Sequence, residues 1–428
     1  TSCLTPEVVL KNSGHCAKFE DIMVRDSKNS DLCYRVDKLI EDKMEKLSEG
    51  KKATPEKKEE YRLVAAQADA MSIEELKETI AKYKIVSPDT GNPLTEPFPF
   101  NLMFGTPIGP TGHLKGYLRP ETAQGQFVNF RRLLEYNGAK MPFASAQIGL
   151  GFRNEIAPRA GLLRVREFQM AEIEHYVHPK KKNHPKFGSV AELKLPLLSQ
   201  ENQLTGGGAV ITDLTVGGAV ETKLIENQTL AYFMSRTFLF LMKCGINPEG
   251  VRFRQHLPTE MAHYASDCWD AEILTSYGWV ECVGHADRAC FDLSRHTEGS
   301  KVELMAAEPL DEPVIKKILI ITSDKKTLGK LFKKGSGDIL ETINSMNEEE
   351  KTAFRKALEE NESYTMTTCK GEYELKKEMF GFEETEKTVK EEKFFPSVIE
   401  PAFGIGRILY SIFEHSFKRR DGDEKRTY

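Results

Sequence analysis

Apolar and polar positions divide the chain of 428 residues into a core and two insertions. Residues 97–300 are apolar and rich in strand-like runs, and residues 393–428 return to that pattern. Residues 27–96 and 301–392 are instead rich in Lys and Glu, and the first of them has apolar residues at helical spacing. We therefore predict a core of strands and helices, completed by residues 1–26 and interrupted by a helical insertion and a second, charged insertion.

The stretch 144–176 reads as two extended arms around a turn. The first arm ends at 152–155, and the second runs from 162 to 175. The connecting segment 156–161 contains a proline and a glycine, which both favour turns. In the second arm a spacing of two places three side chains on one face, namely Arg164, Arg166 and Phe168.

Further elements follow from the same kind of pattern. Residues 8–10, after a proline, predict a strand, and so do residues 252–256. A helix is expected to begin near Thr122 and another to end at Gly245, and residues 363–375 predict a hairpin. Near the C-terminal end, Arg407 opens a helix whose apolar residues are expected to point inward: Ile408, Leu409, Ile412 and Phe413.

Composition limits the class of protein. A hydrophobic fraction of 39% and a charged fraction of 29% are typical of soluble globular proteins. No apolar run approaches the roughly 20 residues of a membrane span, and no signal-peptide pattern is present. The net charge of −5 argues against indiscriminate nucleic-acid binding, so no DNA partner is expected, although a local basic surface stays possible.

The cysteines do not indicate a metal or disulfide framework. The sequence has 8 cysteines and no CxxC pair. His15, Cys16 and Cys33 could meet at a metal ion, but reduced structural thiols in a cytosolic protein are the better interpretation. No zinc is therefore expected.

Candidate chemistry gathers on the predicted hairpin. Arginine grips phosphate, a carboxylate accepts from an exocyclic amine, and a phenylalanine ring stacks on a base. The hairpin supplies these groups from five positions and, less surely, from Glu172: Arg153, Glu155, Arg164, Arg166 and Phe168. A hairpin with a charged, solvated face is the alternative, and spacing alone leaves it open.

Two further carboxylates have both a functional and a structural interpretation. Glu281 lies inside an apolar run, where an unpaired buried charge is costly, so it needs either a partner or an edge position facing solvent. Glu121 precedes a helix start, where backbone N–H groups favour a carboxylate. It could equally be a favourable acid of the first helical turn.

Three ordered motifs resemble those of class II aminoacyl-tRNA synthetases. RNEIAPRAGLLRVREFQMAEIEH (residues 153–175) is similar to the second motif of glycyl-tRNA synthetases of eukaryotic or archaeal type. LRPETAQG (residues 118–125) resembles the amino-acid-binding loop of that family, and IEPAFGIGRILYSIFEH (residues 399–415) resembles the third motif. The resemblance implies an α+β fold, an antiparallel β-sheet flanked by helices with helical insertions.

The resemblance implies ATP-dependent activation of glycine to glycyl-adenylate and its transfer to the 3′ end of tRNA(Gly). Arg153 would contact the α-phosphate, Arg164 the outer phosphates and Arg407 the γ-phosphate, so Arg153 and Arg407 are the implied catalytic residues. Glu155 would accept from the adenine amino group, with Phe168 and Arg407 on either side of the ring. The implied nucleotide contacts are completed by Asn154, Val165, Glu281 and Cys282, with Glu281 acting through a Mg²⁺ ion bound with ATP.

For glycine, the resemblance implies that Glu121, Glu172 and Glu400 hold the ammonium group. Pro401 and Ala402 would border the substrate. The family has serine where this sequence has Ala402, so the pocket is expected to be slightly larger and to have one polar contact fewer. Every competing amino acid is larger than glycine, so a closed wall can reject it without editing.

Partners and alternatives follow from the same resemblance. It implies a homodimer of the intact protein in the cytoplasm, with a mitochondrial form left open, and a first insertion that contacts the tRNA acceptor end. Pro6 would end the first class II motif, and an anticodon-binding domain is not expected within these residues. The alternatives are a synthetase-like accessory or binding protein without aminoacylation, another specificity such as threonine or proline, and diadenosine tetraphosphate synthesis as a side activity.

Overall fold

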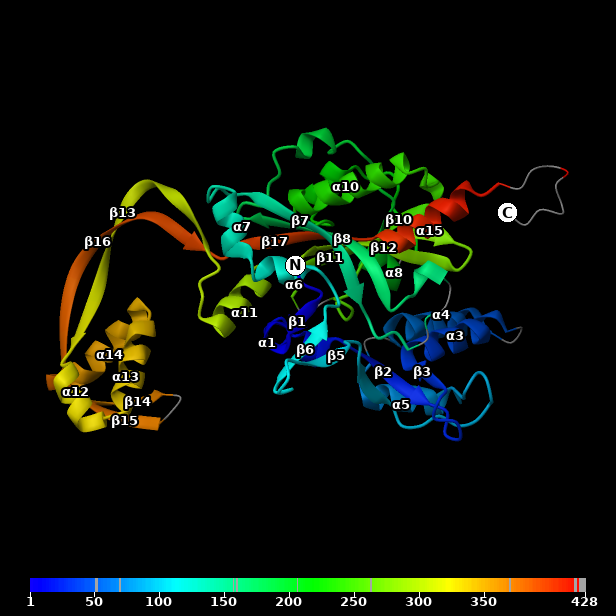
Figure 1. Cartoon of the computed structure of the whole chain (residues 1–428). Coiled ribbons are helices and arrows are strands. Elements are labelled where there is room, and N and C mark those ends of the chain that lie inside the picture. Colours follow the sequence, from blue (N-terminus) through cyan, green and yellow to red (C-terminus); the bar gives the residue numbers. More distant parts are fainter. Residues whose placement is uncertain are drawn as a thin grey trace. The chain divides into compact units, whose positions relative to one another are not determined.

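The computed structural model describes residues 1–50, 53–68, 71–156, 158, 161–205, 207–261, 264–368, 371–418 and 422. The chain forms two compact units, drawn in Figure 1: Thr1–Ala306 with Phe394–Tyr428, and Ala307–Lys393. Part of the predicted turn at 156–161 and the tip of the predicted hairpin at 363–375 lie outside the described residues.

A seven-stranded sheet forms the centre of the first unit. Its strands are, in sheet order, β7 (Phe143–Phe152), β8 (Glu167–Val177), β17 (Ser397–Gly404), β12 (Gly278–Asp287), β11 (Asp267–Thr275), β10 (Val251–Gln255) and β9 (Leu197–Leu198). All neighbours are antiparallel except β10 and β9. Because β17 lies between β8 and β12, the C-terminal motif is hydrogen-bonded to strands that precede it by more than a hundred residues.

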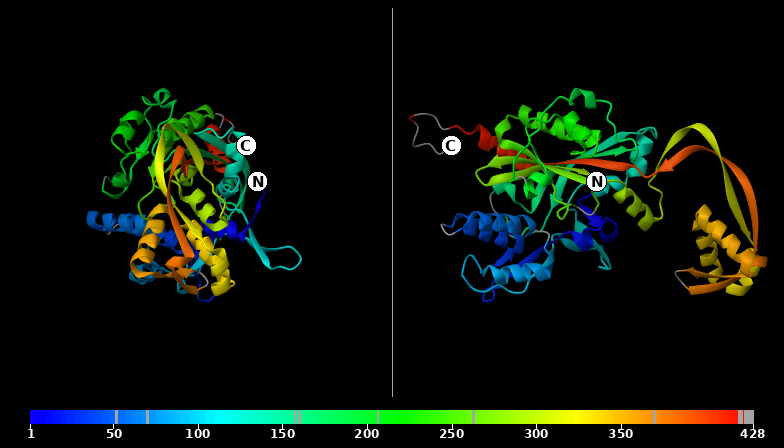
Figure 2. Two further views of the ribbon diagram at one scale, coloured as in Figure 1. Left: turned by 90° about the vertical axis from the view of Figure 1, so that its left-hand side faces the viewer. Right: turned by 180° about the vertical axis from the view of Figure 1, so that it is seen from behind.

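Helices pack against apolar residues of this sheet, and their ribbons lie along it in Figures 1 and 2. The helices of this layer are α9 (Val216–Glu221), α10 (Gln228–Lys243) and α15 (Ile405–Ser416). Helix α8 (Gln200–Leu204) follows β9 in the chain. Leu230 and Met234 of α10 pack with Phe253 and Trp269 of the sheet, all fully buried. Helix α10 ends just before Gly245, as predicted, and Gly245 has the left-handed backbone, φ +90°, that commonly follows a helix.

A second core cluster lies where three helices meet β7, β8 and β17. These helices are α6 (Ala123–Phe127), α7 (Phe130–Tyr136) and α11 (Phe291–Ser300). Phe127, Phe130 and Tyr176 are completely buried in this cluster. The start of α6, with Thr122 at its N-cap, agrees with the helix predicted near Thr122.

The N-terminal part of the first unit holds two small sheets. The first sheet has the order β1 (Leu4–Pro6), β6 (Leu114–Leu118) and β5 (Gly105–Ile108), and α1 (Glu7–Asn12) and α2 (His15–Lys18) adjoin it. The second sheet has the order β3 (Cys33–Arg35), β2 (Glu20–Arg25) and β4 (Phe98–Asn101). Its helices are α3 (Val36–Glu49), α4 (Pro55–Gln67) and α5 (Ile73–Lys82), and they share a core with β2.

The second unit has a hydrophobic core of its own. Its strands are β13 (Ala306–Ser323), which pairs with β16 (Phe380–Phe394), and β14 (Ser363–Thr368), which pairs with β15 (Gly371–Lys376). Its helices are α12 (Lys325–Phe332), α13 (Gly335–Ser345) and α14 (Glu348–Asn361). The antiparallel β14 and β15 confirm the predicted hairpin arms.

Three local predictions are wrong. Residues 8–10 form part of helix α1, because only Leu10 of this stretch is buried and Glu7 bonds Lys11 one turn on at 2.8 Å. In α15, Ile408 is buried, but Leu409 and Phe413 are 40% and 65% exposed, so only part of the predicted apolar face packs inward. Arg164 and Arg166 precede β8, which begins only at Glu167.

Candidate active site

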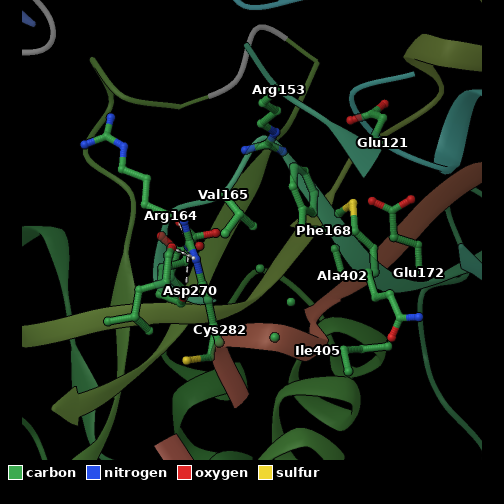
Figure 3. A pocket seen from close by; sticks show the side chains of 18 of the residues that line it. Glu121, Arg153, Arg164, Val165, Phe168, Glu172, Asp270, Cys282, Ala402 and Ile405 are labelled. Carbon is green, nitrogen blue, oxygen red and sulfur yellow. Dashed lines mark hydrogen bonds and ion pairs between the residues drawn. The ribbon is translucent and has the colours of Figure 1, made fainter. Parts of the chain in front are cut away.

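A cavity of about 510 Å³ opens on the central sheet beside the loop between β7 and β8 (Figure 3). It is lined by twelve of the site residues implied by the motifs, which are Glu121, Arg153, Glu155, Arg164, Val165, Phe168, Glu172, Glu281, Cys282, Glu400, Ala402 and Arg407. Asn154 and Pro401 do not line it. Figure 3 shows Glu121 and Glu172 on one side of Phe168 and Arg164 on the other.

Arg153 and Phe168 form a stacked pair at one end of the cavity. The Arg153 guanidinium carbon lies 5.3 Å from the centre of the Phe168 ring and 5.4 Å from that of Phe19. Gly151 makes room for the ring, because a Cβ atom there would lie 2.7 Å from Phe168. The arginine is therefore held by ring faces, and its buried Nε has no hydrogen-bond partner among the described residues.

The loop that follows β7 is stabilised by an ion pair. Arg164 Nε donates to Glu155 Oε2 at 2.9 Å, and Arg166 Nε donates to the Glu155 carbonyl at 2.9 Å. A 3-10 turn at Gly161–Leu163 precedes Arg164, so period-two alternation does not apply there. Arg164 and Arg166 thus belong to the loop and not to a strand face.

Arg407 connects three parts of the site. Its Nε donates to the Leu163 carbonyl at 3.1 Å, and its Nη1 donates to the Glu281 carbonyl at 2.8 Å and lies 3.5 Å from Glu281 Oε2. The Glu281 side chain is 53% exposed, so β12 places it at the open side of the cavity. The Cys282 thiol is buried against Ser411, and burial raises its pKa to about 12.

Buried carboxylates form the other end of the cavity. Glu172 Oε2 accepts from the Thr122 backbone N–H at 2.6 Å and from the Thr122 hydroxyl. Glu400 Oε2 accepts from Arg288 Nη1 at 2.8 Å, and Glu121 Oε1 lies 3.8 Å from Arg288 Nη2. The resemblance implied these three acids; β8 and β17 carry Glu172 and Glu400, and the segment before α6 adds Glu121.

The pKa values of these carboxylates are shifted in different directions. Burial raises the pKa of Glu400 to about 8 although Arg288 opposes the shift, and burial with the charge of Glu121 raises the pKa of Glu172. For Glu121 the effect of burial is outweighed by His15 and Arg288, which lower its pKa. A bound cation would favour the ionised forms of Glu172 and Glu400 and so oppose the upward shifts of their pKa values.

Arg288 is the main residue that sequence reasoning missed. It is completely buried, donates to both oxygens of Asp292 at 2.7 and 3.0 Å, and stacks 3.8 Å from the centre of the Tyr264 ring. The sequence feature that could have indicated Arg288 is its place directly after an apolar strand, with an aspartate four residues later. His256 was also missed: its Nε2 bonds Asp270 at 2.8 Å in the cavity wall.

Within the part of the chain that the structure describes, no group of three or more His, Cys, Asp and Glu side chains could hold a metal ion alone. Mg²⁺ is usually bound by one or two carboxylates together with substrate phosphates. The exposed carboxylate of Glu281 beside the cavity fits that mode. No helix of the described residues is long and apolar enough to span a bilayer.

Comparison with known proteins shows extended similarity to one family. A "Glycine--tRNA ligase" of Drosophila melanogaster is 53% identical over 428 residues, which are 100% of this chain and 56% of that protein. A "Glycine--tRNA ligase" of Methanocaldococcus jannaschii is 43% identical over 99% of this chain and 70% of that protein. The chain thus spans little more than half the length of the first relative.

Other comparisons add less. No family model matches the chain. A solved structure of prolyl-tRNA synthetase from Cryptosporidium parvum, in complex with L-proline and AMP, matches with a TM-score of 0.33 at 8% identity. It covers 74% of this chain and 38% of that protein, and so low a TM-score does not bear on the fold.

Proposed function

Since the chain belongs to the glycine--tRNA ligase family, we propose that it activates glycine with ATP and transfers it to the 3′ end of tRNA(Gly). The observation that carries this proposal is a single cavity with buried carboxylates at one end and arginines with an aromatic ring at the other. The first end suits an ammonium group, and the second suits a nucleotide phosphate and base.

The glycine carboxylate is itself the nucleophile. One of its oxygens forms a bond to the α-phosphorus of ATP while the bond from that phosphorus to pyrophosphate breaks. No general base is needed, so catalysis consists of alignment and of charge neutralisation on the phosphoryl oxygens. Arg153 would bind the α-phosphate, and Glu281 would hold Mg²⁺ with the phosphates, where the ion neutralises charge on the leaving pyrophosphate.

The loop ion pair would rearrange on nucleotide binding. Arg164 and Glu155 now bond each other at 2.9 Å. In the proposed complex Arg164 turns to the outer phosphates and Glu155 accepts from the adenine amino group. Phe168 and Arg407 would lie on either side of the base, and the backbone of Cys282 would border the ribose because its thiol is buried.

Glycine recognition would use charge and size together. Glu121, Glu172 and Glu400 would accept from the ammonium group, and each charge-assisted hydrogen bond contributes about 1.5–3 kcal/mol. Ala402 pairs with Glu172 across β8 and β17, so the methyl group borders this pocket. The second step, attack of the terminal ribose hydroxyl of tRNA on the mixed anhydride, would occur at the same cavity.

The proposal extends to partners and location. It includes a homodimer, the acceptor end of tRNA(Gly) as a contact of residues 27–96, and a place in the cytoplasm. The alternative of an accessory protein is disfavoured because Arg153, Arg164 and Arg407 are all present at the cavity. Threonine or proline specificity is disfavoured because recognition of a larger side chain would need groups other than these buried carboxylates.

Amino-acid-dependent ATP–pyrophosphate exchange tests the proposal. The assay compares glycine, alanine, serine and no amino acid, with the unaltered chain, Arg153→Ala and Arg131→Ala as the matched control. Arg131 is 67% exposed on α7 and pairs with Glu135. Exchange with glycine alone, lost in Arg153→Ala and kept in Arg131→Ala, supports the proposal. No exchange with any amino acid would contradict it.

A further inference from the structure

A short segment of the N-terminal part contacts both ends of the cavity. The segment consists of helix α2 (His15–Lys18) and the following Phe19. His15 Nε2 lies 3.5 Å from Glu121 Oε1 at the carboxylate end. The Phe19 ring lies against the Arg153 guanidinium at the other end, 5.4 Å from ring centre to guanidinium carbon. No role follows for either residue from the motifs or from the proposed function.

The orientation of His15 is determined by a second hydrogen bond. Ser13 Oγ lies 2.8 Å from His15 Nδ1, and both residues are buried. A carboxylate has no proton to donate, so the favourable arrangement has the proton of His15 on Nε2, facing Glu121. Nδ1 then accepts from the Ser13 hydroxyl at 2.8 Å, a shorter contact than that of the same hydroxyl with the Leu10 carbonyl at 3.3 Å. The ring therefore presents a donor to the carboxylate in its neutral form as well as in its charged form.

Phe19 determines the orientation of Arg153 in a comparable way. The guanidinium carbon lies over both rings, 5.4 Å from the centre of Phe19 and 5.3 Å from that of Phe168. Backbone hydrogen bonds extend this contact, because the Leu102 N–H donates to the Phe19 carbonyl at 3.1 Å and the Asn154 N–H donates to the Leu102 carbonyl at 2.7 Å. The segment is thereby connected to the residue that follows Arg153.

The two contacts belong to one rigid piece of chain. The rings of His15 and Phe19 pack with their centres 5.6 Å apart. Gly14, at φ +86°, starts α2 in the left-handed region, which a residue with a Cβ atom rarely adopts. A displacement of this turn would therefore move the partners of Glu121 and Arg153 together.

We propose that residues 15–19 are a positioning element of the activation site, in which His15 orients Glu121 for the ammonium group and Phe19 orients Arg153 for the α-phosphate. Neither side chain needs to touch a substrate. The inference rests on the proposed function, since it assigns each residue to one substrate contact of the activation step. It predicts that the two positions affect different substrates although they lie four residues apart.

Exchange kinetics with paired substitutions test the His15 half. In His15→Gln the side-chain amide nitrogen can take the place of Nε2 and keep the contact with Glu121. In His15→Asn the amide nitrogen takes the place of Nδ1, so the contact with Glu121 is lost. We expect His15→Asn to raise KM for glycine roughly tenfold, as for a charge-assisted hydrogen bond, with KM for ATP nearly unchanged. His15→Gln should retain most of the affinity for glycine.

The Phe19 half has its own pair. Phe19→Leu removes the ring face and should raise KM for ATP about fivefold with KM for glycine nearly unchanged, whereas Phe19→Tyr keeps the ring and should behave as the unaltered chain. Thermal unfolding of each variant reports whether the fold is intact.

The outcomes separate the inference from the proposed function. The positioning role is supported if His15→Asn raises only the KM for glycine and Phe19→Leu raises only the KM for ATP. If the unaltered chain exchanges with glycine but the variants change only kcat and melting temperature, or change both KM values equally, the positioning role is refuted. If the unaltered chain shows no glycine-dependent exchange, the proposed function fails and this inference fails with it.

Discussion

Substitution of the buried Arg288 by Met provides a quantitative test of how the carboxylates are held. Arg288 is completely buried and bonds Asp292 at 2.7 and 3.0 Å and Glu400 at 2.8 Å. Without it, the side-chain hydrogen bond left to Asp292 among the described residues is the one from Gln124 at 3.1 Å. Glu400 loses the one side-chain hydrogen bond that the described residues provide. Methionine fills much of the volume, so the main loss is electrostatic.

The magnitude follows from the burial of the stranded groups. Removing one partner of a buried ion pair costs about 3–5 kcal/mol, because a charge stays buried without compensation. Protonation of Glu400 relieves part of this cost, and its pKa, about 8 with Arg288 present, would rise further without the cation. A carboxyl whose native pKa is raised above its unfolded value contributes stability that is lost as pH rises. The deficit of Arg288→Met should therefore be larger at about pH 9 than at about pH 6.

Urea unfolding followed by tryptophan fluorescence measures the loss in free energy of unfolding of the first compact unit, which contains Arg288. The two tryptophans, Trp269 and Trp279, both lie in the first compact unit. Arg295→Met is the matched control in α11, the helix that follows Arg288, since Arg295 is 51% exposed and pairs with Glu298. It should cost less than about 1 kcal/mol. A deficit for Arg288→Met below about 1 kcal/mol, or one equal at both pH values, would refute the reasoning.

Three further predictions concern substrate binding. Gly151→Ala would place a Cβ atom 2.7 Å from Phe168, where about 3.5–4.0 Å is normal, so KM for ATP should rise up to about 10²-fold. The control Gly188→Ala adds its Cβ atom in open space and should leave KM unchanged. Equal kinetics of the two variants would exclude the steric argument. Because Glu400 has a pKa of about 8, KM for glycine should fall as pH rises toward that value, and Glu400→Gln should abolish that pH dependence; a profile unaltered by the substitution would count against its role in ammonium binding. Ala402→Ser should strengthen discrimination against alanine in the exchange assay, and equal activation of alanine by both proteins would contradict this.

Local patterns were sufficient for much of the framework. The turn-forming residues and alternation around 144–176 predicted the pairing of β7 with β8, and the pairing is antiparallel over its whole length. Thr122 and Gly245 marked helix ends correctly; at Gly245 the reason is local, because glycine readily adopts the left-handed backbone that follows a helix. The extent of β8 was not predictable, because the 3-10 turn at Gly161–Leu163 interrupts an apparently regular spacing.

The residue types of the site could be predicted only as far as a motif carries them. The acids at 121, 172 and 400 and the arginines at 153 and 407 stand in motifs, and all line one cavity. Glu281 was ambiguous in sequence, since the alternatives of a paired site and a solvent-facing edge could not be separated. In the structure its side chain is both half-exposed and within reach of Arg407.

What the sequence by itself determined was the set of elements and the chemical character of the site, because hydrophobic period, caps and charged motifs are written in neighbouring residues. Tertiary structure alone decided which charges are neighbours. β17 enters the sheet between β8 and β12, and so Glu400 meets Arg288, while His15 reaches Glu121 from a segment about a hundred residues earlier. Burial and charge partners depend on such long-range packing, and no spacing along the chain encodes them.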